Sequence, residues 1–248
     1  LASAVCALAL ATSAQAEVTI GMITTLSGGG AGLGVDARDG FLLALEQSDN
    51  ASDIRLVIED DAQRPEMAVQ IAERMVQSER ADILTGIIWS NLAMAVVPSV
   101  VAQDIFYLSV NAGPSALAGA NCHQNYFNVA WQNDTLDEAA GQTANELGYT
   151  NAFIMAPNYP AGTDALNGFK RYFEGELAGE LFTQVGQTDY AAEIAQIRPV
   201  RTIHRHDQVE AVKIVALHLA RLLTGNIETV TRGDGNRTRV RCGTDMPS

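Results

Sequence analysis

The most chemically suggestive stretch of the chain is the glycine-rich segment TTLSGGGAGLGVDARDG, residues 24–40. Glycine turns that follow a strand cradle phosphates in nucleotide-binding proteins, because bare backbone amides can approach the pyrophosphate. The dinucleotide pattern G-x-G-x-x-G is met only in a relaxed form that starts at Gly32 and ends on Ala37, well past the preceding strand. The phosphate-loop pattern G-x-x-x-x-G-K-[ST] does not occur. We therefore predict that this segment binds no nucleotide and that the protein uses no cofactor.

Ser90 stands where a predicted strand ends and a predicted helix begins. A serine hydroxyl beside the first amides of a helix can bind an anion such as a carboxylate. The alternative is a plain helix N-cap, in which the hydroxyl only satisfies those amides. The run Asn111, Ala112 and Gly113 follows another strand, and it is either a ligand contact or an ordinary turn.

Two acidic residues, Asp60 and Asp61, follow the second predicted strand. They fit a structural pair ahead of the helix that starts near Pro65 better than a pair of acid–base catalysts. An exported hydrolase is the weaker alternative class, because the chain has neither G-x-S-x-G nor H-E-x-x-H and Ser90 has no evident histidine partner. We predict no catalytic residues and no enzymatic activity.

Strands and helices alternate along the body of the chain, which predicts an α/β fold with parallel sheets flanked by helices. The expected strands are residues 17–24, 54–60, 81–87, 105–110, 151–157 and 180–187. The expected helices are residues 37–48, 65–78, 90–103, 137–148, 163–173 and 189–198. The alternation restarts after residue 128, which predicts an N-terminal lobe of residues 17–128 and a partial second lobe of residues 129–198. Ligands of such sheets bind beyond the carboxyl ends of the strands, where the polar segments described above stand.

The charge of the chain is uneven. The net charge is −13 over 248 residues, which argues against a nucleic-acid partner because phosphate contacts need clustered Lys and Arg. Residues 1–200 hold 8 of the 16 Lys and Arg and 24 of the 29 Asp and Glu, a balance of −16. Residues 201–248 hold the other 8 basic residues and only 5 acids, a balance of +3. The sequence therefore changes character near residue 199.

The first residues, LASAVCALALATSAQA, are an apolar run that ends in Ala14-Gln15-Ala16, the pattern that signal peptidase cleaves. We predict that residues 1–16 are the remnant of a signal peptide, that Glu17 begins the mature chain, and that the protein is exported to the periplasm. A membrane anchor is the alternative. Cys122 and Cys242 then remain, too few for a disulfide scaffold, and their pairing is left open.

Several ordered blocks of the sequence carry a resemblance to a known family. These blocks are the export signal, GMITTLSGGGAGLG, IEDDAQRPEMAVQIAERMV, GIIWSNLAMAVVPSV, SVNAGPSALAG and MAPNYPAGTDALNGFKRYF. Together they resemble the periplasmic solute-binding proteins of branched-chain amino acid type ABC importers, over about residues 1–198. The resemblance implies a two-lobed type I periplasmic binding protein fold that closes on a small solute and delivers it to a membrane permease.

The resemblance also implies roles for individual residues. Ser90 and the run from Asn111 to Gly113 match the positions at which the family grips a ligand's carboxylate and ammonium. Gly113 stands where amino-acid binders carry a hydroxyl, and Leu33 stands where they place an aromatic ring over the ligand. The wording NAGPSALAG beside Trp89 resembles members that take aromatic or other small carboxylates. Tyr159, after the first strand of the second lobe, is the candidate from the opposite wall, with a structural tyrosine as the alternative.

The resemblance stops near residue 198, and residues 199–248 read as an atypical basic tail. Within it, residues 208–225 have the pattern of a helix that ends at Gly225. We predict no metal site there, because no carboxylate or cysteine cluster accompanies the three histidines His204, His206 and His218. A frameshift is our hypothesis for this tail, and translation of the other two frames beyond codon 198 tests it. A ligand-sensing receptor ectodomain of the same fold is the alternative function.

Overall fold

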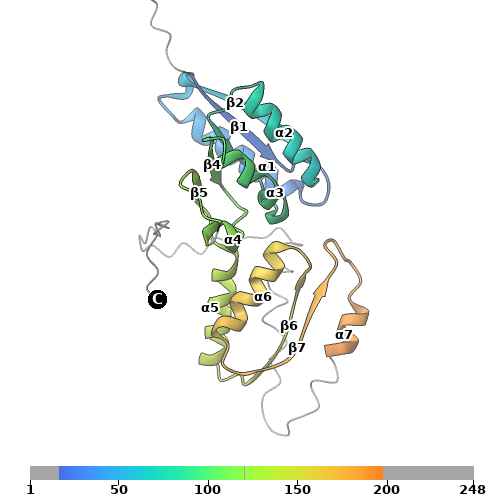
Figure 1. The fold of residues 1–248 in the computed structure, drawn as a ribbon. Helices are drawn as coiled ribbons and strands as arrows, with labels where there is room; N and C mark the ends of the chain where they lie inside the picture. The colour runs from blue at the N-terminus through green and yellow to red at the C-terminus, as the bar shows by residue number, and fades with distance from the viewer. Residues whose placement is uncertain (1–16, 120, 198–248) are drawn as a thin grey trace, which may run out of the picture.

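The computed structural model describes residues 17–119 and 121–197, and these form two parallel β-sheets with helices packed on them (Figure 1). The strands of the first sheet are β1 (Val18–Thr24), β2 (Ile54–Asp60), β3 (Ile83–Thr85), β4 (Phe106–Ser109) and β5 (Tyr126–Asn128). The second sheet contains β6 (Asn151–Pro157) and β7 (Glu176–Thr183). The helices are α1 (Ala31–Glu46), α2 (Pro65–Gln77), α3 (Ser90–Val101), α4 (Ser115–Ala118), α5 (Asn133–Glu146), α6 (Pro160–Tyr172) and α7 (Ala191–Ile197), with a short 3₁₀ turn at Ala51–Asp53.

The order of strands in the first sheet locates its topological switch point. The order is β2-β1-β3-β4-β5, and every neighbouring pair is parallel. The chain leaves β1 in one direction to form β2 and returns past β1 to form β3, so the strand order reverses between β1 and β3. In open parallel sheets the crevice at such a switch point, beyond the carboxyl ends of the strands, is where ligands bind. The predicted α/β fold with helix-flanked parallel sheets is confirmed.

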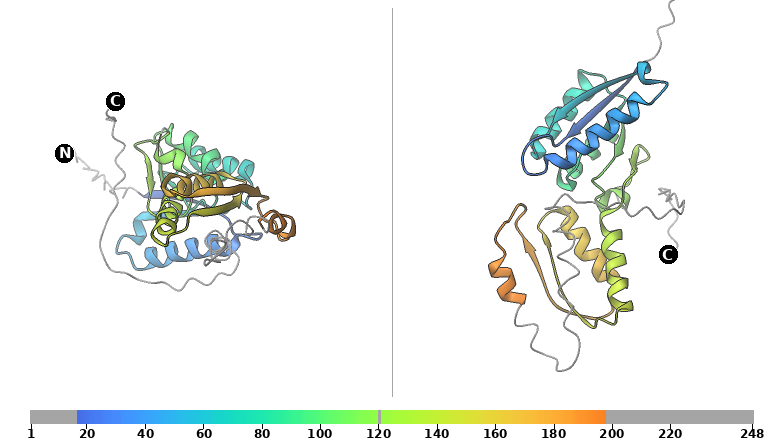
Figure 2. Two further views of the ribbon diagram at one scale, coloured as in Figure 1. Left: turned by 90° about the horizontal axis from the view of Figure 1, so that it is seen from below. Right: turned by 180° about the vertical axis from the view of Figure 1, so that it is seen from behind.

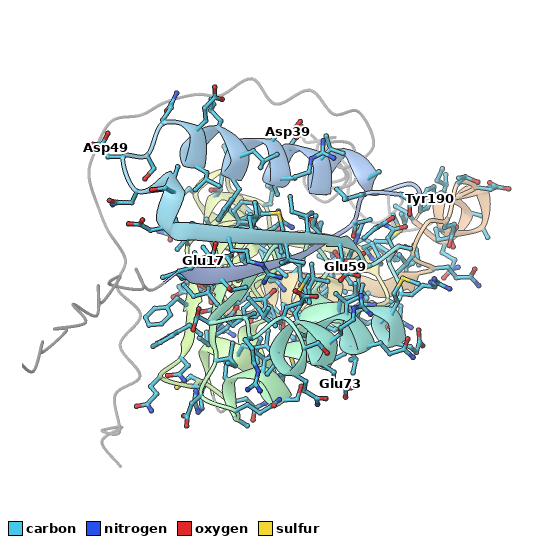
Figure 3. The ribbon with its side chains drawn as sticks, turned by 90° about the horizontal axis from the view of Figure 1, so that it is seen from above. Glu17, Asp39, Asp49, Glu59, Glu73 and Tyr190 are labelled. Carbon is cyan, nitrogen blue, oxygen red and sulfur yellow. The ribbon has the colours of Figure 1, made fainter. Side chains whose placement is uncertain are left out.

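The main core lies between the first sheet and α2 and α3. Figure 3 shows α1 on one side of the β1–β2 pair and α2 on the other, with Glu17 and Glu59 at opposite ends of the pair. In the centre of α2, Ala68, Ile71 and Met75 are buried on one face of the helix. Each large apolar side chain buried in this way contributes about 1.5–3 kcal/mol to the stability of the fold.

The glycine segment is folded differently from our prediction. The helix after β1 begins at Ala31 and not near residue 37, so Gly32 and Gly34 lie inside α1. A Cβ on Gly34 would stand 1.9 Å from the carbonyl oxygen of Thr25, which shows that α1 packs directly on bare backbone at the end of β1. The loop that remains is residues 25–30, with Gly28 at a φ of +79°.

Other element bounds also differ. The strand β5 and the short helix α4 were not predicted, because each has four residues or fewer and too little periodicity to detect. The helix α5 begins four residues earlier than predicted, at Asn133, and β7 spans residues 176–183 instead of 180–187. The hydrophobic pattern marks the buried face of an element better than its ends.

The second sheet carries a smaller core. Both α5 and α6 lie against β6 and β7 on one face, as Figures 1 and 2 show, and α7 lies on the far side of β7. Ile154, Leu166, Phe169 and Phe173 are buried there. Between the two sheets β5 ends at Asn128 and α5 begins at Asn133, while the division into two lobes at residue 128 stays a prediction.

Three expectations concern the ends of the chain and its cysteines. The expected signal peptide remnant and basic tail lie outside the described residues. Within the described part of the chain, no helix is both long enough and apolar enough to span a bilayer. Cys122 is a free, half-buried thiol, and Cys242 lies outside the described residues.

Candidate ligand-binding site

The amino terminus of α3 follows β3, one of the two strands between which the strand order reverses. Ser90 is the first residue of the helix, and Trp89 occupies the N-cap position without a side-chain capping bond. The alternative that Ser90 is a plain N-cap is therefore wrong. Ser90 is only 3% exposed, and its Oγ accepts a hydrogen bond from Asn133 Nδ2 at 3.1 Å. An uncapped helix start beside a serine hydroxyl suits an anionic group.

The segment after β4 is fixed against the end of β3. Asn111 Nδ2 donates to the carbonyl oxygen of Ile88 at 2.9 Å, which ties this segment to the residues just before Trp89. The carbonyl oxygen of Ala112 accepts hydrogen bonds from the hydroxyls of Ser109 and Tyr126. The Ala112 carbonyl is therefore already hydrogen-bonded within the protein.

Gly113 has no room for a side chain. A Cβ at this position would stand 1.9 Å from the carbonyl oxygen of Trp131, so the hydroxyl that amino-acid binders place here has no space in this chain. Two residues later, Ser115 Oγ is buried and has no partner within the described residues. The backbone amide of Ser115 donates to Asp164 Oδ2 at 3.0 Å.

A polar network joins the two sheets at this place. The side-chain amide of Asn133, at the start of α5, donates both to Ser90 Oγ and, at 2.9 Å, to Asp164 Oδ2. Asp164 lies on α6, one turn after Tyr159. The Asn133 amide therefore links the start of α3, which belongs to the first sheet, to a helix of the second.

Two aromatic rings face each other across the same boundary. The centroids of Trp89 and Tyr159 are 6.4 Å apart and their planes are tilted by 58°. Both side chains are half-buried. Burial raises the pKa of Tyr159, and the negative charge of Asp164 raises it further, so the phenol stays protonated and available as a donor. Such a pair gives the site an apolar wall with a polar tip.

Asp60 and Asp61 hold the loop after β1, as expected of a structural pair. Asp60 Oδ1 accepts the backbone amides of Leu26 and Ala62, both at 2.8 Å. Burial alone would raise the pKa of Asp60, but hydrogen bonds, the one from the Ser27 side chain foremost, outweigh it and hold the pKa below its ordinary value. For Asp61 burial prevails and raises the pKa, in spite of the hydrogen bonds that its carboxylate accepts.

The structure brings some of the predicted residues together but not all. The Trp89 ring approaches Tyr159, Ser90 is hydrogen-bonded to Asn133, and Asn111 is hydrogen-bonded to Ile88, the residue before Trp89. Leu33 lies in the first turn of α1, half-buried, and the residue whose backbone approaches the Trp89 ring is Gly30. The roles assigned to these residues remain predictions.

Asn133 and Asp164 escaped sequence reasoning, and Thr25 and Ser115 were noted only as members of segments that follow strands. Asn133 and Ser90 are separated by 43 residues, and Asn133 and Asp164 by 31. The sole local signal is that Thr25 and Ser115 follow strand ends, since contacts across such separations leave no periodic trace. In the described part of the chain no three His, Cys, Asp or Glu side chains are grouped to hold a metal ion.

Comparison with known proteins agrees with this architecture. Residues 17–199 match the family described as "Periplasmic binding protein". Curated protein sequences include no significant match. An ABC transporter substrate-binding protein from Sphaerobacter thermophilus is 30% identical, with a TM-score of 0.67 over 74% of this chain and 52% of that one. A solute-binding protein of an ABC transporter from R. palustris, in complex with benzoate, is 26% identical, with a TM-score of 0.69 over 75% and 53% of the two chains.

A more distant structure shares the fold alone. The branched-chain amino acid transporter substrate binding protein LivJ from Streptococcus pneumoniae, in complex with isoleucine, is 18% identical, with a TM-score of 0.66 over 73% of this chain and 54% of that one. The present chain thus spans about half the length of the solved structures that it matches. Because the family match covers well over half of the sequence and the parallel sheets agree with it, the chain belongs to the periplasmic binding protein family.

Proposed function

We propose that this protein binds a small carboxylate solute, either an amino acid or an aromatic acid, in the periplasm and delivers it to the permease of an ABC importer. One observation carries the proposal: the half-buried Trp89 ring, at the uncapped start of α3 next to Ser90, approaches the ring of Tyr159 from the second sheet. An anion-binding helix start beside an aromatic wall suits a carboxylate with an apolar body.

The relatives supply the ligand classes to test. The R. palustris protein is described in complex with benzoate and the Streptococcus protein in complex with isoleucine. Both ligands join a carboxylate to an apolar group, which is the chemistry that the proposed site offers. Export with cleavage after Ala16 belongs to the same proposal.

Thermal unfolding in the presence of benzoate or isoleucine tests the proposal on the chain beginning at Glu17. A ligand at one hundred times its Kd stabilises the folded state by about 2.7 kcal/mol, which raises the Tm of a domain of this size by about 5–10 °C. Ser90→Ala removes a hydrogen bond to a charged group and should weaken binding about tenfold or more. Ser99→Ala, an exposed site on the same helix, is the control and should bind as well as the unmodified protein.

Two results would contradict the proposal. The first is an unchanged Tm with benzoate, isoleucine and other small carboxylates. The second is a Ser90→Ala variant that binds with the same affinity as Ser99→Ala. A change in Tm that disappears only with Ser90→Ala supports it.

A further inference from the structure

The ring of Trp89 is attached to the protein interior by two hydrogen bonds in series. Its Nε1–H donates to Thr25 Oγ1 at 3.1 Å, and the Thr25 hydroxyl donates to Asp61 Oδ1 at 2.7 Å. Thr25 and Asp61 have no exposed surface, whereas Trp89 is half-buried. We call this chain of hydrogen bonds the Asp61–Thr25–Trp89 relay. It connects a side chain that can touch a ligand to two side chains that cannot.

Each group of the relay has a single possible role. The indole Nε1–H only donates, so Thr25 Oγ1 must be the acceptor of that bond. The one proton of the Thr25 hydroxyl is then free to point at Asp61, and an ionised carboxylate only accepts. Asp61 is itself held in place, because its Oδ1 also accepts the backbone amide of Gln63 at 2.9 Å. The donors and acceptors of the relay therefore run in one order, from Trp89 through Thr25 to Asp61, and the indole nitrogen is held at one position.

The ring is also confined at its edge and on one side. A Cβ on Gly30 would stand 2.3 Å from Trp89 Cζ2 and 3.0 Å from its Cε2, so the six-membered part of the indole lies against bare backbone. The ring of Tyr159 approaches with a centroid separation of 6.4 Å. With its nitrogen held at Thr25 and its edge at Gly30, the indole keeps one orientation.

The relay spans the switch point of the sheet. Thr25 directly follows β1, Trp89 comes shortly after β3, and the reversal of strand order lies between these two strands. The hydrogen bond between Thr25 and Trp89 thus joins the segments that follow these two strands, which is the region where ligands of such sheets bind.

We infer that Thr25 and Asp61 are positioning residues that set the plane of the Trp89 ring as the aromatic wall of the ligand site, with Gly30 as the surface that the ring rests on. Thr25 and Asp61 act on a ligand only through Trp89. The effect on ligand affinity rests on the proposed function, whereas the effect on the ring itself is a property of the free protein.

The ring is tested first without ligand, in the full chain carrying Trp131→Phe so that Trp89 is the remaining tryptophan. Thr25→Val keeps the shape of the side chain and removes the hydroxyl, whereas Thr25→Ser keeps the hydroxyl. We expect Thr25→Val to lose the near-ultraviolet circular dichroism band of Trp89 and to increase quenching of its fluorescence by acrylamide. Thr25→Ser should leave both signals unchanged.

A second pair of variants leaves the hydrogen bonds untouched. Gly30→Ala places a methyl group where the indole edge lies, while a Cβ on its neighbour Gly29 would meet nothing within 4 Å. Neither glycine has a positive φ, so the substitutions introduce no backbone strain. We expect Gly30→Ala to change the Trp89 spectrum and Gly29→Ala to leave it as it is.

The inference is overturned if Thr25→Val keeps the Trp89 signals while Thr25 variants remain folded, or if Thr25→Ser loses them as fully as Thr25→Val. Should Thr25→Val fail to fold, the glycine pair decides, and equal spectra for Gly30→Ala and Gly29→Ala overturn it.

Titration with benzoate then tests the link to the ligand. We expect Thr25→Val and Gly30→Ala to bind benzoate about tenfold more weakly, because each loses one well-placed contact. Thr25→Ser and Gly29→Ala should bind it as well as the unmodified protein. Changed Trp89 signals with unchanged benzoate affinity would overturn the ligand part of the inference. If the unmodified protein binds no carboxylate, the proposed function fails, but the ligand-free spectra still decide whether the relay positions the ring.

Discussion

The two β–α connections that border the candidate site begin alike. A Cβ on Gly34 would stand 1.9 Å from the carbonyl oxygen of Thr25, and a Cβ on Gly162 would stand 1.8 Å from that of Pro157. In both places a helix packs directly on the backbone at the end of the preceding strand. Both sheets therefore need a glycine at the same structural position, although the two segments share little sequence.

The two connections differ in the burial of the side chains that hydrogen-bond near them. In the first, Thr25 donates a hydrogen bond to Asp61, which is fully buried. In the second, Tyr159 precedes α6 and Asp164 lies within it, both are half-buried, and Asp164 is tied to the first sheet through Asn133. Hydrogen bonds between buried groups resist exchange with water, whereas half-buried ones can be replaced by water or ligand. We therefore expect the side of the site formed by Thr25 and Asp61, called the fixed wall below, to keep its contacts. The contacts of the side formed by Tyr159 and Asp164 can change.

The largest expected effect is on the fixed wall. Gly34→Ala forces a methyl group against the Thr25 carbonyl and should lower the free energy of unfolding by about 3 kcal/mol. Gly32→Ala in the same helix, where a Cβ meets nothing within 4 Å, should instead stabilise the protein by about 0.5–1 kcal/mol. Urea unfolding of both variants measures the difference. Equal stabilities would show that α1 does not pack on Thr25.

A smaller effect is expected where the two walls meet. Asn133→Ala removes the link between Ser90 and Asp164 and should cost about 1 kcal/mol, the net contribution of a typical hydrogen bond. Its clearer consequence should be looser coupling of the two sheets, seen as faster hydrogen exchange of the first amides of α3. Asn167→Ala, at an exposed position on α6, is the control. Identical exchange in both variants would contradict this reading of the network.

The smallest effect is a pH dependence that separates two neighbours in the fixed wall. The pKa of Asp61 is raised above its ordinary 3.8, so from about that pH upward the folded state holds a proton that the unfolded chain has released. The Asp61 contribution to stability therefore falls as pH rises through this window. The pKa of Asp60 is lowered from 3.8, so its contribution is present above that pH and is lost as pH falls towards the folded value.

Replacement of each aspartate by asparagine checks these signs. We would measure the free energy of unfolding by urea between about pH 3 and pH 7. Asp61→Asn should remove the fall in this free energy as pH rises, and Asp60→Asn should remove its fall as pH is lowered. The two variants should thus change the slope of stability against pH in opposite directions. A change in the same direction would refute the assignment.

Prediction from sequence succeeded where a residue's neighbours in the chain carry the information. The face of α2 that is buried around Ile71 follows from the 3.6-residue period, and the bounds of β2 and β6 follow from short apolar runs. It failed at Gly32 and Gly34, which look like loop residues but lie within α1. Helix propensity alone opposes a helix at both glycines, and only Gly34 packs on the Thr25 carbonyl.

The candidate site likewise contains residues that could be predicted from sequence and contacts that could not. Sequence alone places Ser90, Trp89 and Asn111 just after strand ends, and the family resemblance adds Tyr159. Only the tertiary structure shows that Asn133 bridges Ser90 to Asp164 and that Trp89 donates to Thr25.

The sequence alone was enough to predict the order of strands and helices other than β5 and α4, the buried face of α2 and the family, because local hydrophobic patterns and ordered sequence blocks carry this information. The tertiary structure decided which strand ends adjoin, which glycines face backbone or an indole ring, and which carboxylate is buried. These depend on distances between residues far apart in the chain, and such distances exist only once the sheets have formed.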